Sequence, residues 1–154
     1  MFIPMQPHNQ SLTISLTVVG AAAALEHYPK AVNAELVQKF AMPNGDIVHA
    51  TLKIQDTLVY LSEEFPQWKA LSPKTLGGCP SLICLQVEDP DAAHAQAVAA
   101  GAEVIDPVQD YLWGERGGVV VDPFGYRWAF TKHIEDVSEE EMFRRAMEQM
   151  SGQG

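Results

Sequence analysis

The chain contains an internal repeat, which constrains its architecture more than any local motif. When the sequence is shifted by 68 positions, Val19 falls on Val87 and Ala24 falls on Ala92, and the match continues to Val37 without a gap. Each half is too short to bury a sufficient core alone. Repetition at a fixed period therefore predicts two copies of one unit packed side by side in a single domain.

Composition limits the classes of partner. The chain has 154 residues, of which 47% are hydrophobic, so it can bury the core of one compact domain. The formal net charge of −10 argues against binding to nucleic acid or to anionic lipid, because both need clusters of Lys and Arg. No apolar run approaches the roughly 18 residues of a membrane span. We therefore expect neither a nucleic-acid partner nor a membrane.

The N-terminus and the cysteines favour a cytoplasmic protein. Residues 1–10 have no basic segment followed by a long apolar one, so they are unlike a signal peptide. The two cysteines, Cys79 and Cys84, have the spacing of neither a redox pair nor a zinc knuckle. A reducing compartment is the natural setting for such a chain.

Hydrophobic periodicity predicts the same order of elements, βαβββ, in both halves. Between Ser11 and Val18 apolar and hydroxyl side chains alternate, as in a half-buried strand. Asn44-Gly45 between apolar runs indicates a hairpin. The expected strands are 11–18, 34–41, 46–54, 57–62, 81–87, 102–108, 117–121 and 126–133, with helices over 20–32 and 90–100.

We expect a single domain over residues 1–154. Its first βαβββ module spans 11–62, a connector rich in Pro and Gly spans 63–79, and the second module spans 80–133. Residues 134–154 form a C-terminal helix and tail, in which Ser138 and Glu141 have the spacing of a capping box. An apolar stripe on this helix contains Met142, Phe143, Ala146, Met147 and Met150.

Several ordered segments carry a family resemblance. They are Met42-Pro43-Asn44-Gly45 with His49-Ala50, Leu61 to Pro66, Ser72 to Thr75, Val87-Glu88-Asp89, Trp113 to Gly118 and Asp122 to Trp128. On a duplicated chain, this set resembles the vicinal oxygen chelate superfamily, and within it the glyoxalase/bleomycin-resistance-like (PhnB-like) branch. The resemblance implies an α+β fold in which paired βαβββ modules form a cupped mixed sheet, with helices on the outer face and ligands inside.

The resemblance also implies where a metal would bind. Enzymes of the superfamily hold a divalent metal through His, Glu or Gln on the first and fourth strands of each module. The corresponding positions here carry Thr13, Tyr60, Leu82 and Ala129, which are not the usual ligands. We therefore expect no metal and no other cofactor.

Strand alternation predicts which side chains face the cup. The predicted ligand cavity is lined by His49, Tyr60 and Trp113, with Arg127 or Arg116 at its polar end. His49 is the best catalytic candidate, because its pKa lies naturally near working pH; the alternative is a wall histidine that only positions a ligand. Tyr60 either donates a hydrogen bond from its hydroxyl to a ligand or fills the space that a metal would occupy.

The remaining candidates have ordinary structural alternatives. Glu64 lies at the rim of the cup, as a ligand-binding group or as a solvated charge. Trp113 lines an apolar pocket or covers a domain edge or dimer seam. Arg116 binds an anionic group or pairs with nearby carboxylates. The other histidines, His8, His27, His94 and His133, have no metal-ligand spacing, and we expect them at the surface.

Three classes of function stay open. The first is metal-free binding of a small apolar or aromatic molecule in the cup. The second is a lyase, isomerase or dioxygenase-type enzyme with atypical ligands or with His49 as its central group. The third is a module whose cup is collapsed and filled. In each case we expect a homodimer, because the C-terminal apolar stripe needs cover.

Overall fold

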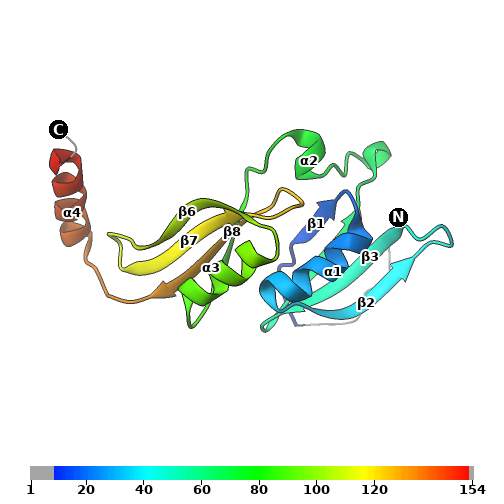
Figure 1. Cartoon of the computed structure of the whole chain (residues 1–154), viewed down its shortest axis with the longest axis horizontal. Coiled ribbons are helices and arrows are strands. Elements are labelled where there is room, and N and C mark those ends of the chain that lie inside the picture. Colours follow the sequence, from blue (N-terminus) through cyan, green and yellow to red (C-terminus); the bar gives the residue numbers. More distant parts are fainter. Residues whose placement is uncertain (1–8, 153–154) are drawn as a thin grey trace.

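The structure, a computed structural model, describes residues 9–152. It contains two modules with the same order of elements (Figure 1). The first consists of β1 (Ser15–Val18), α1 (Ala21–Val32), β2 (Glu35–Ala41), β3 (Ile47–Ile54) and β4 (Thr57–Glu63). The second consists of β5 (Leu82–Gln86), α3 (Pro90–Ala99), β6 (Glu103–Asp110), β7 (Glu115–Val121) and β8 (Arg127–His133).

Each module forms a four-stranded mixed sheet. The strand orders are β1-β4-β3-β2 and β5-β8-β7-β6, so the two sheets have the same topology. The first strand of each module pairs in parallel with the last, and the other pairs are antiparallel. The prediction of paired βαβββ modules is confirmed, although the two sheets are separate hydrogen-bonded units.

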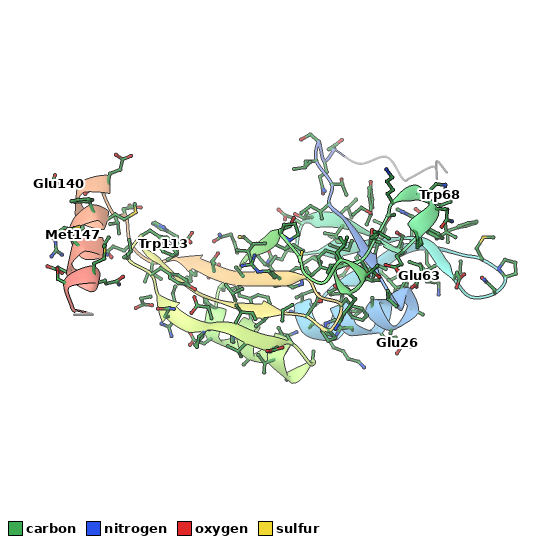
Figure 2. All side chains as sticks on the ribbon, turned by 90° about the horizontal axis from the view of Figure 1, so that it is seen from above. Glu26, Glu63, Trp68, Trp113, Glu140 and Met147 are labelled. Carbon is green, nitrogen blue, oxygen red and sulfur yellow. The ribbon has the colours of Figure 1, made fainter. Side chains whose placement is uncertain are left out.

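Helices α1 and α3 lie on the same side of the molecule, α1 over the first sheet and α3 over the second (Figures 1 and 2). Strand alternation explains this arrangement, because one series of side chains on each strand is apolar and packs under a helix. Leu16, Leu52, Leu61 and Trp128 belong to this series and are 2% exposed or less. The opposite side of each sheet is covered by neither α1 nor α3, and we call it the open face.

The two modules are joined by α1 against α3 and by the turn between β7 and β8. Asp122 begins this turn and is only 6% exposed. Its Oδ2 accepts hydrogen bonds from Tyr28 Oη at 2.6 Å and from Trp128 Nε1 at 2.9 Å. Its Oδ1 accepts from the backbone N–H groups of Phe124 and Tyr126. One buried carboxylate therefore ties the first module to the second.

The repeat has a different register from the one expected. A shift of 68 pairs Ala24 with Ala92, but Ala24 is fully buried whereas Ala92 is exposed. In the same way, buried Leu16 would fall on exposed Cys84. The shift holds after the helices, where Ala34 and Ala102 are both buried. The gapless alignment was wrong over the helices, which are offset by one further residue. The face predicted for β5 from strand alternation agrees with the structure, because Cys84 is exposed and Ile83 packs against the core.

The first strand is shorter than expected. Only residues 15–18 form it, and Leu12 and Ile14 are 79% and 48% exposed rather than buried. The segment before β1 is held beside β4 by a side chain, because the Gln10 amide donates to Leu58 O and accepts from Leu58 N. This amide replaces the backbone ladder that the alternating pattern predicted.

The connector and the C-terminal segment also form local structure. The connector contains η1 (Pro66–Trp68) and the single-turn helix α2 (Pro73–Leu76), which packs on β1. After β8, α4 (Glu139–Gly152) stands at the end of the second module (Figure 1). Ser138 Oγ accepts from Glu141 N, so the hydroxyl half of the capping box is present. Within residues 9–152 no helix is long and apolar enough to span a membrane.

One histidine expected at the surface is buried. His94 is 8% exposed and lies over Gly118, where an added Cβ would meet its ring at 2.8 Å. Glycine at this position therefore makes room for the imidazole. His27 is partly buried at the junction of α1 with the turn that contains Phe124. His133 is exposed as expected, and His8 lies outside the described residues.

Candidate functional site

The open face of the first sheet carries a row of polar side chains. The strand register places Ser15 opposite Tyr60, Tyr60 opposite Thr51, and Thr51 opposite Gln38. Residues directly opposite one another point to the same face with their Cβ atoms about 5 Å apart. Four strands therefore present one continuous line of hydroxyl and amide groups, as strand alternation predicted for three of them.

His49 lies beside this row. Its Nε2 is 3.1 Å from Thr51 Oγ1, and its ring centroid is 5.1 Å from that of Tyr60. The side chain is buried, and burial lowers the pKa of His49 below 6.5 because it disfavours the charged imidazolium. A neutral imidazole at pH 7 can accept a proton or hydrogen-bond a ligand.

Sequence reasoning missed Gln38. Its Oε1 is buried, and no described residue hydrogen-bonds to it. The strand register assigns Gln38 to the row on the open face. The hairpin signal at Asn44-Gly45 could have found it, because the hairpin pairs β2 with β3. The register shifts within this pair hide the correspondence from simple counting.

Arg127 lies on the open face of the second sheet. It pairs with Leu82 on β5 and with Val121 on β7, in the series of β8 that alternates with buried Trp128 and Phe130. Among residues 9–152 it has neither an ion pair nor a hydrogen bond. A guanidinium at this position is able to pair with an anionic group.

Arg116 lies on the other side of the second sheet. It is opposite Lys132, one residue out of phase with the open-face series. Its guanidinium donates two hydrogen bonds of 2.8 Å to Asp91, at the start of α3, and one of 2.8 Å to Asp110. These carboxylates raise the pKa of Arg116. The chain uses this arginine to hold α3 to the hairpin, rather than in the cup.

Trp113 is far from His49 and Tyr60 within one chain. Figure 2 places it at the end of the second module next to α4. Its ring stacks on Tyr111 with centroids 4.4 Å apart, and its Nε1 donates to Glu115 at 3.0 Å. The side chain remains 44% exposed. The chain therefore brings together His49 and Tyr60, but it does not bring Trp113 to them.

The two glutamates at the rim serve backbone structure. Glu63 accepts hydrogen bonds from Gly20 N and Ala21 N at the start of α1, where the helix dipole favours an anion. Glu64 accepts from Ser72 N and from Thr75 Oγ1 around α2, and these bonds lower its pKa. Glu64, predicted as a candidate ligand group, thus holds the connector in place.

The residues at the expected metal positions do not fit a metal ion. Neither an imidazole nor a carboxylate is present at these positions, which carry Thr13, Tyr60, Leu82 and Ala129. His49 contributes an imidazole to the open face from a different position. Within residues 9–152 no three His, Cys, Asp or Glu side chains gather in a group that could hold a cation.

Comparison with known proteins identifies the family. The sequence profile of the Glyoxalase/Bleomycin resistance protein/Dioxygenase superfamily matches residues 11–130, which include all eight strands except the end of the last. The chain belongs to this superfamily. The resemblance to the superfamily is thereby confirmed, as is the fold class that it implied; the PhnB-like branch stays a prediction.

Relatives within the superfamily extend this result without giving a ligand. Uncharacterized proteins of Mycobacterium tuberculosis and Mycobacterium bovis are 38% identical over 145 residues. The match covers 92% of this chain and 84% and 93% of theirs, respectively. Their similarity shows that the whole domain is shared, including the region after residue 130.

Solved structures of the superfamily have the same fold. TioX from Micromonospora sp. ML1 superimposes with a TM-score of 0.63 at 24% identity, over 82% of this chain and all of that one. A glyoxalase/bleomycin resistance protein/dioxygenase family enzyme from Burkholderia phytofirmans gives a TM-score of 0.64 at 14% identity, over 79% and 97%. At these identities the likeness concerns the fold alone.

Proposed function

We propose that this protein binds a small apolar or aromatic molecule on the open face of its first sheet, without a metal ion. The observation that carries the proposal is the contact of His49 with Tyr60 and Thr51 on that face. Two rings form an aromatic wall, and hydroxyl and amide groups beside them orient a ligand. Such a mixture is typical of small-molecule sites.

Arg127 supports a ligand with an anionic end. It is on the open face of the second sheet, the two open faces lie on the same side of the chain, and no described residue neutralises its guanidinium. A carboxylate or phosphate could pair with it bidentately. The proposed ligand therefore has an aromatic or apolar body that contacts Tyr60 and a polar or anionic group.

We propose that the protein acts as a homodimer in which Trp113 of one copy reaches the His49 region of the other. Two features support this arrangement. Trp113 is exposed at the far end of its own chain, and the stripe on α4 leaves Phe143, Met147 and Met150 between 46% and 72% exposed. Both thiols are free, which suits the reducing cytoplasm as the proposed compartment.

A second candidate is a metal-independent lyase or isomerase. It is favoured by the lowered pKa of His49, which keeps the imidazole neutral and able to accept a proton from a bound substrate. The test is turnover of a molecule that has first been found to bind. A bound molecule recovered unchanged after prolonged incubation leaves binding as the function.

The binding proposal is tested by a thermal-shift ligand screen on the parent and on His49→Ala and Trp113→Ala. Loss of the ligand-induced shift in both variants is the expected result. Trp68→Ala is the matched control, because Trp68 is similarly exposed (54%) but lies on the connector. Hits that bind both site variants as tightly as the parent would place the site elsewhere. Native mass spectrometry of the purified protein reports metal content and oligomer in the same preparation.

A further inference from the structure

A separate cavity lies at the seam between the two modules. It has a volume of about 290 Å³ and is bounded by β1 with the residues before it, β5, the connector with α2, and Tyr126. We call it the seam cavity. Neither His49 nor Tyr60 lines it, but it borders the site proposed above, because Ser15 pairs with Tyr60 and Leu82 pairs with Arg127.

The seam cavity is lined by apolar and uncharged groups. Its apolar lining residues include Leu16, Leu71, Pro73, Pro80 and Ile83. The polar side chains among its described lining residues are two serines, the Cys79 thiol and the Tyr126 hydroxyl, and none of those lining residues is charged. In a chain with 19% charged residues, this composition favours an uncharged apolar occupant.

The walls of the seam cavity are fixed by hydrogen bonds and close packing. Tyr126 Oη accepts from Thr17 N at 2.8 Å and donates to Thr17 O at 3.0 Å, which locks the second module against β1. The connector is held by Glu64, which binds both Ser72 and Thr75. Pro73 packs on Gly125 so closely that an added Cβ would lie 2.8 Å from it. A cavity with fixed walls binds without an ordering cost.

The mouth of the seam cavity carries apolar side chains that nothing in the described chain covers. Leu76, Ile14 and Leu82 line the cavity and are 62%, 48% and 40% exposed. An apolar ligand would remove part of this surface from water. The volume is roughly twice the 150 Å³ of a cavity known to admit benzene, which sets the size of the ligand.

We propose that the seam cavity is a second binding site, for a neutral apolar molecule about the size of a bicyclic aromatic. The ligand touches both modules, so its binding also stabilises their junction. Because the lining is uncharged, the site discriminates against an anion of the same shape. This inference is independent of the function proposed for the open face.

The test uses 1-naphthol as a neutral bicyclic probe and 1-naphthoate as its anionic counterpart, each titrated by fluorescence into the full chain. Saturable binding of one equivalent of 1-naphthol per chain is expected, with binding of 1-naphthoate at least about tenfold weaker. Leu76→Glu should weaken 1-naphthol binding about tenfold, because it places a carboxylate at the mouth. Val98→Glu, an exposed apolar position on α3, should leave it unchanged.

Cys79 locates the probe. In a Cys84→Ser background, Cys79 is the one remaining thiol, and saturating 1-naphthol should slow its alkylation. His49→Ala should bind 1-naphthol as the parent does. The proposal is overturned by absence of saturable binding, by unchanged affinity in Leu76→Glu, or by unprotected Cys79 at saturation. Loss of binding in His49→Ala would also overturn it, because that result would move the probe to the open face.

Discussion

At the residue scale, the junction between the two modules depends on the buried carboxylate of Asp122. The sequence indicated a tight turn at Asp122-Pro123-Phe124-Gly125, and the structure has it. The sequence could not indicate that the carboxylate also accepts a hydrogen bond from the hydroxyl of Tyr28, which lies 94 positions earlier. Side chains that meet across modules leave no periodic signal, so such contacts follow only from the assembled fold.

Asp122→Asn should lower the free energy of unfolding by about 3 kcal/mol, because an amide brings its own donors to a site where four donors already converge. Tyr28→Phe removes one of these donors and should cost about 1 kcal/mol. Urea denaturation measures both. Asp56→Asn, at an exposed hairpin turn, is the control and should stay within about 0.5 kcal/mol of the parent. Equal effects of the two Asn variants would contradict the role of Asp122.

His27 should make stability depend on pH above the range in which carboxylates titrate. Burial lowers the pKa of His27 below 6.5, with smaller opposing effects from Asp122 and the backbone of Ala100. The unfolded chain then binds more protons, so the free energy of unfolding falls as pH decreases from 6.5. His27→Gln should flatten this fall between pH 7.5 and 5.5 in urea titrations. An unchanged pH slope would show that His27 does not contribute.

At the element scale, strand and helix positions could be predicted well, whereas their registers could not. Apolar periodicity predicted every strand, and helices α1 and α3, to within a few residues, because each is half-buried against one core. The repeat register failed at Ala24, because in an Ala-rich helix a shift of one residue preserves composition while it changes the buried face. The predicted open-face row lacked Gln38 for a related reason, because bulges shift the register of β2 against β3.

The stripe on α4 should mediate self-association. No strand or helix of the described chain packs against α4, and Arg145 anchors it through Glu135 and Leu112 O. Phe143→Glu should therefore shift the protein from dimer to monomer in sedimentation velocity without loss of folded structure. Gln149→Glu, on the same helix, adds the same charge outside the stripe and should remain dimeric. A parent that is monomeric at micromolar concentration would contradict this role of α4.

At the scale of the whole molecule, charge is distributed unevenly. Residues 81–154 contain fourteen of the twenty Asp and Glu residues but only five of the ten Lys and Arg residues. The half of the chain from residue 81 on, which includes α4, is therefore strongly acidic, and the half before it is nearly neutral. Contact between two second modules would oppose like charges, whereas a second module facing a partner's first module avoids this repulsion. The charge distribution therefore favours an antiparallel dimer, in which the first module of each chain faces the second module of its partner.

An antiparallel pair makes each site from two chains, and mixing variants tests this directly. His49→Ala and Trp113→Ala should each abolish binding of a ligand found in the screen, because each removes one half of every site. In a mixture of the two, heterodimers carry one site with both residues intact and one site lacking both. After dissociation and random reassociation, half of the dimers are mixed, so about a quarter of the sites should bind with the parent's affinity. Isothermal titration of the mixture measures that fraction. If the mixture binds no better than either variant alone, His49 and Trp113 do not form a shared site, and the aromatic wall is restricted to His49 and Tyr60 of a single chain.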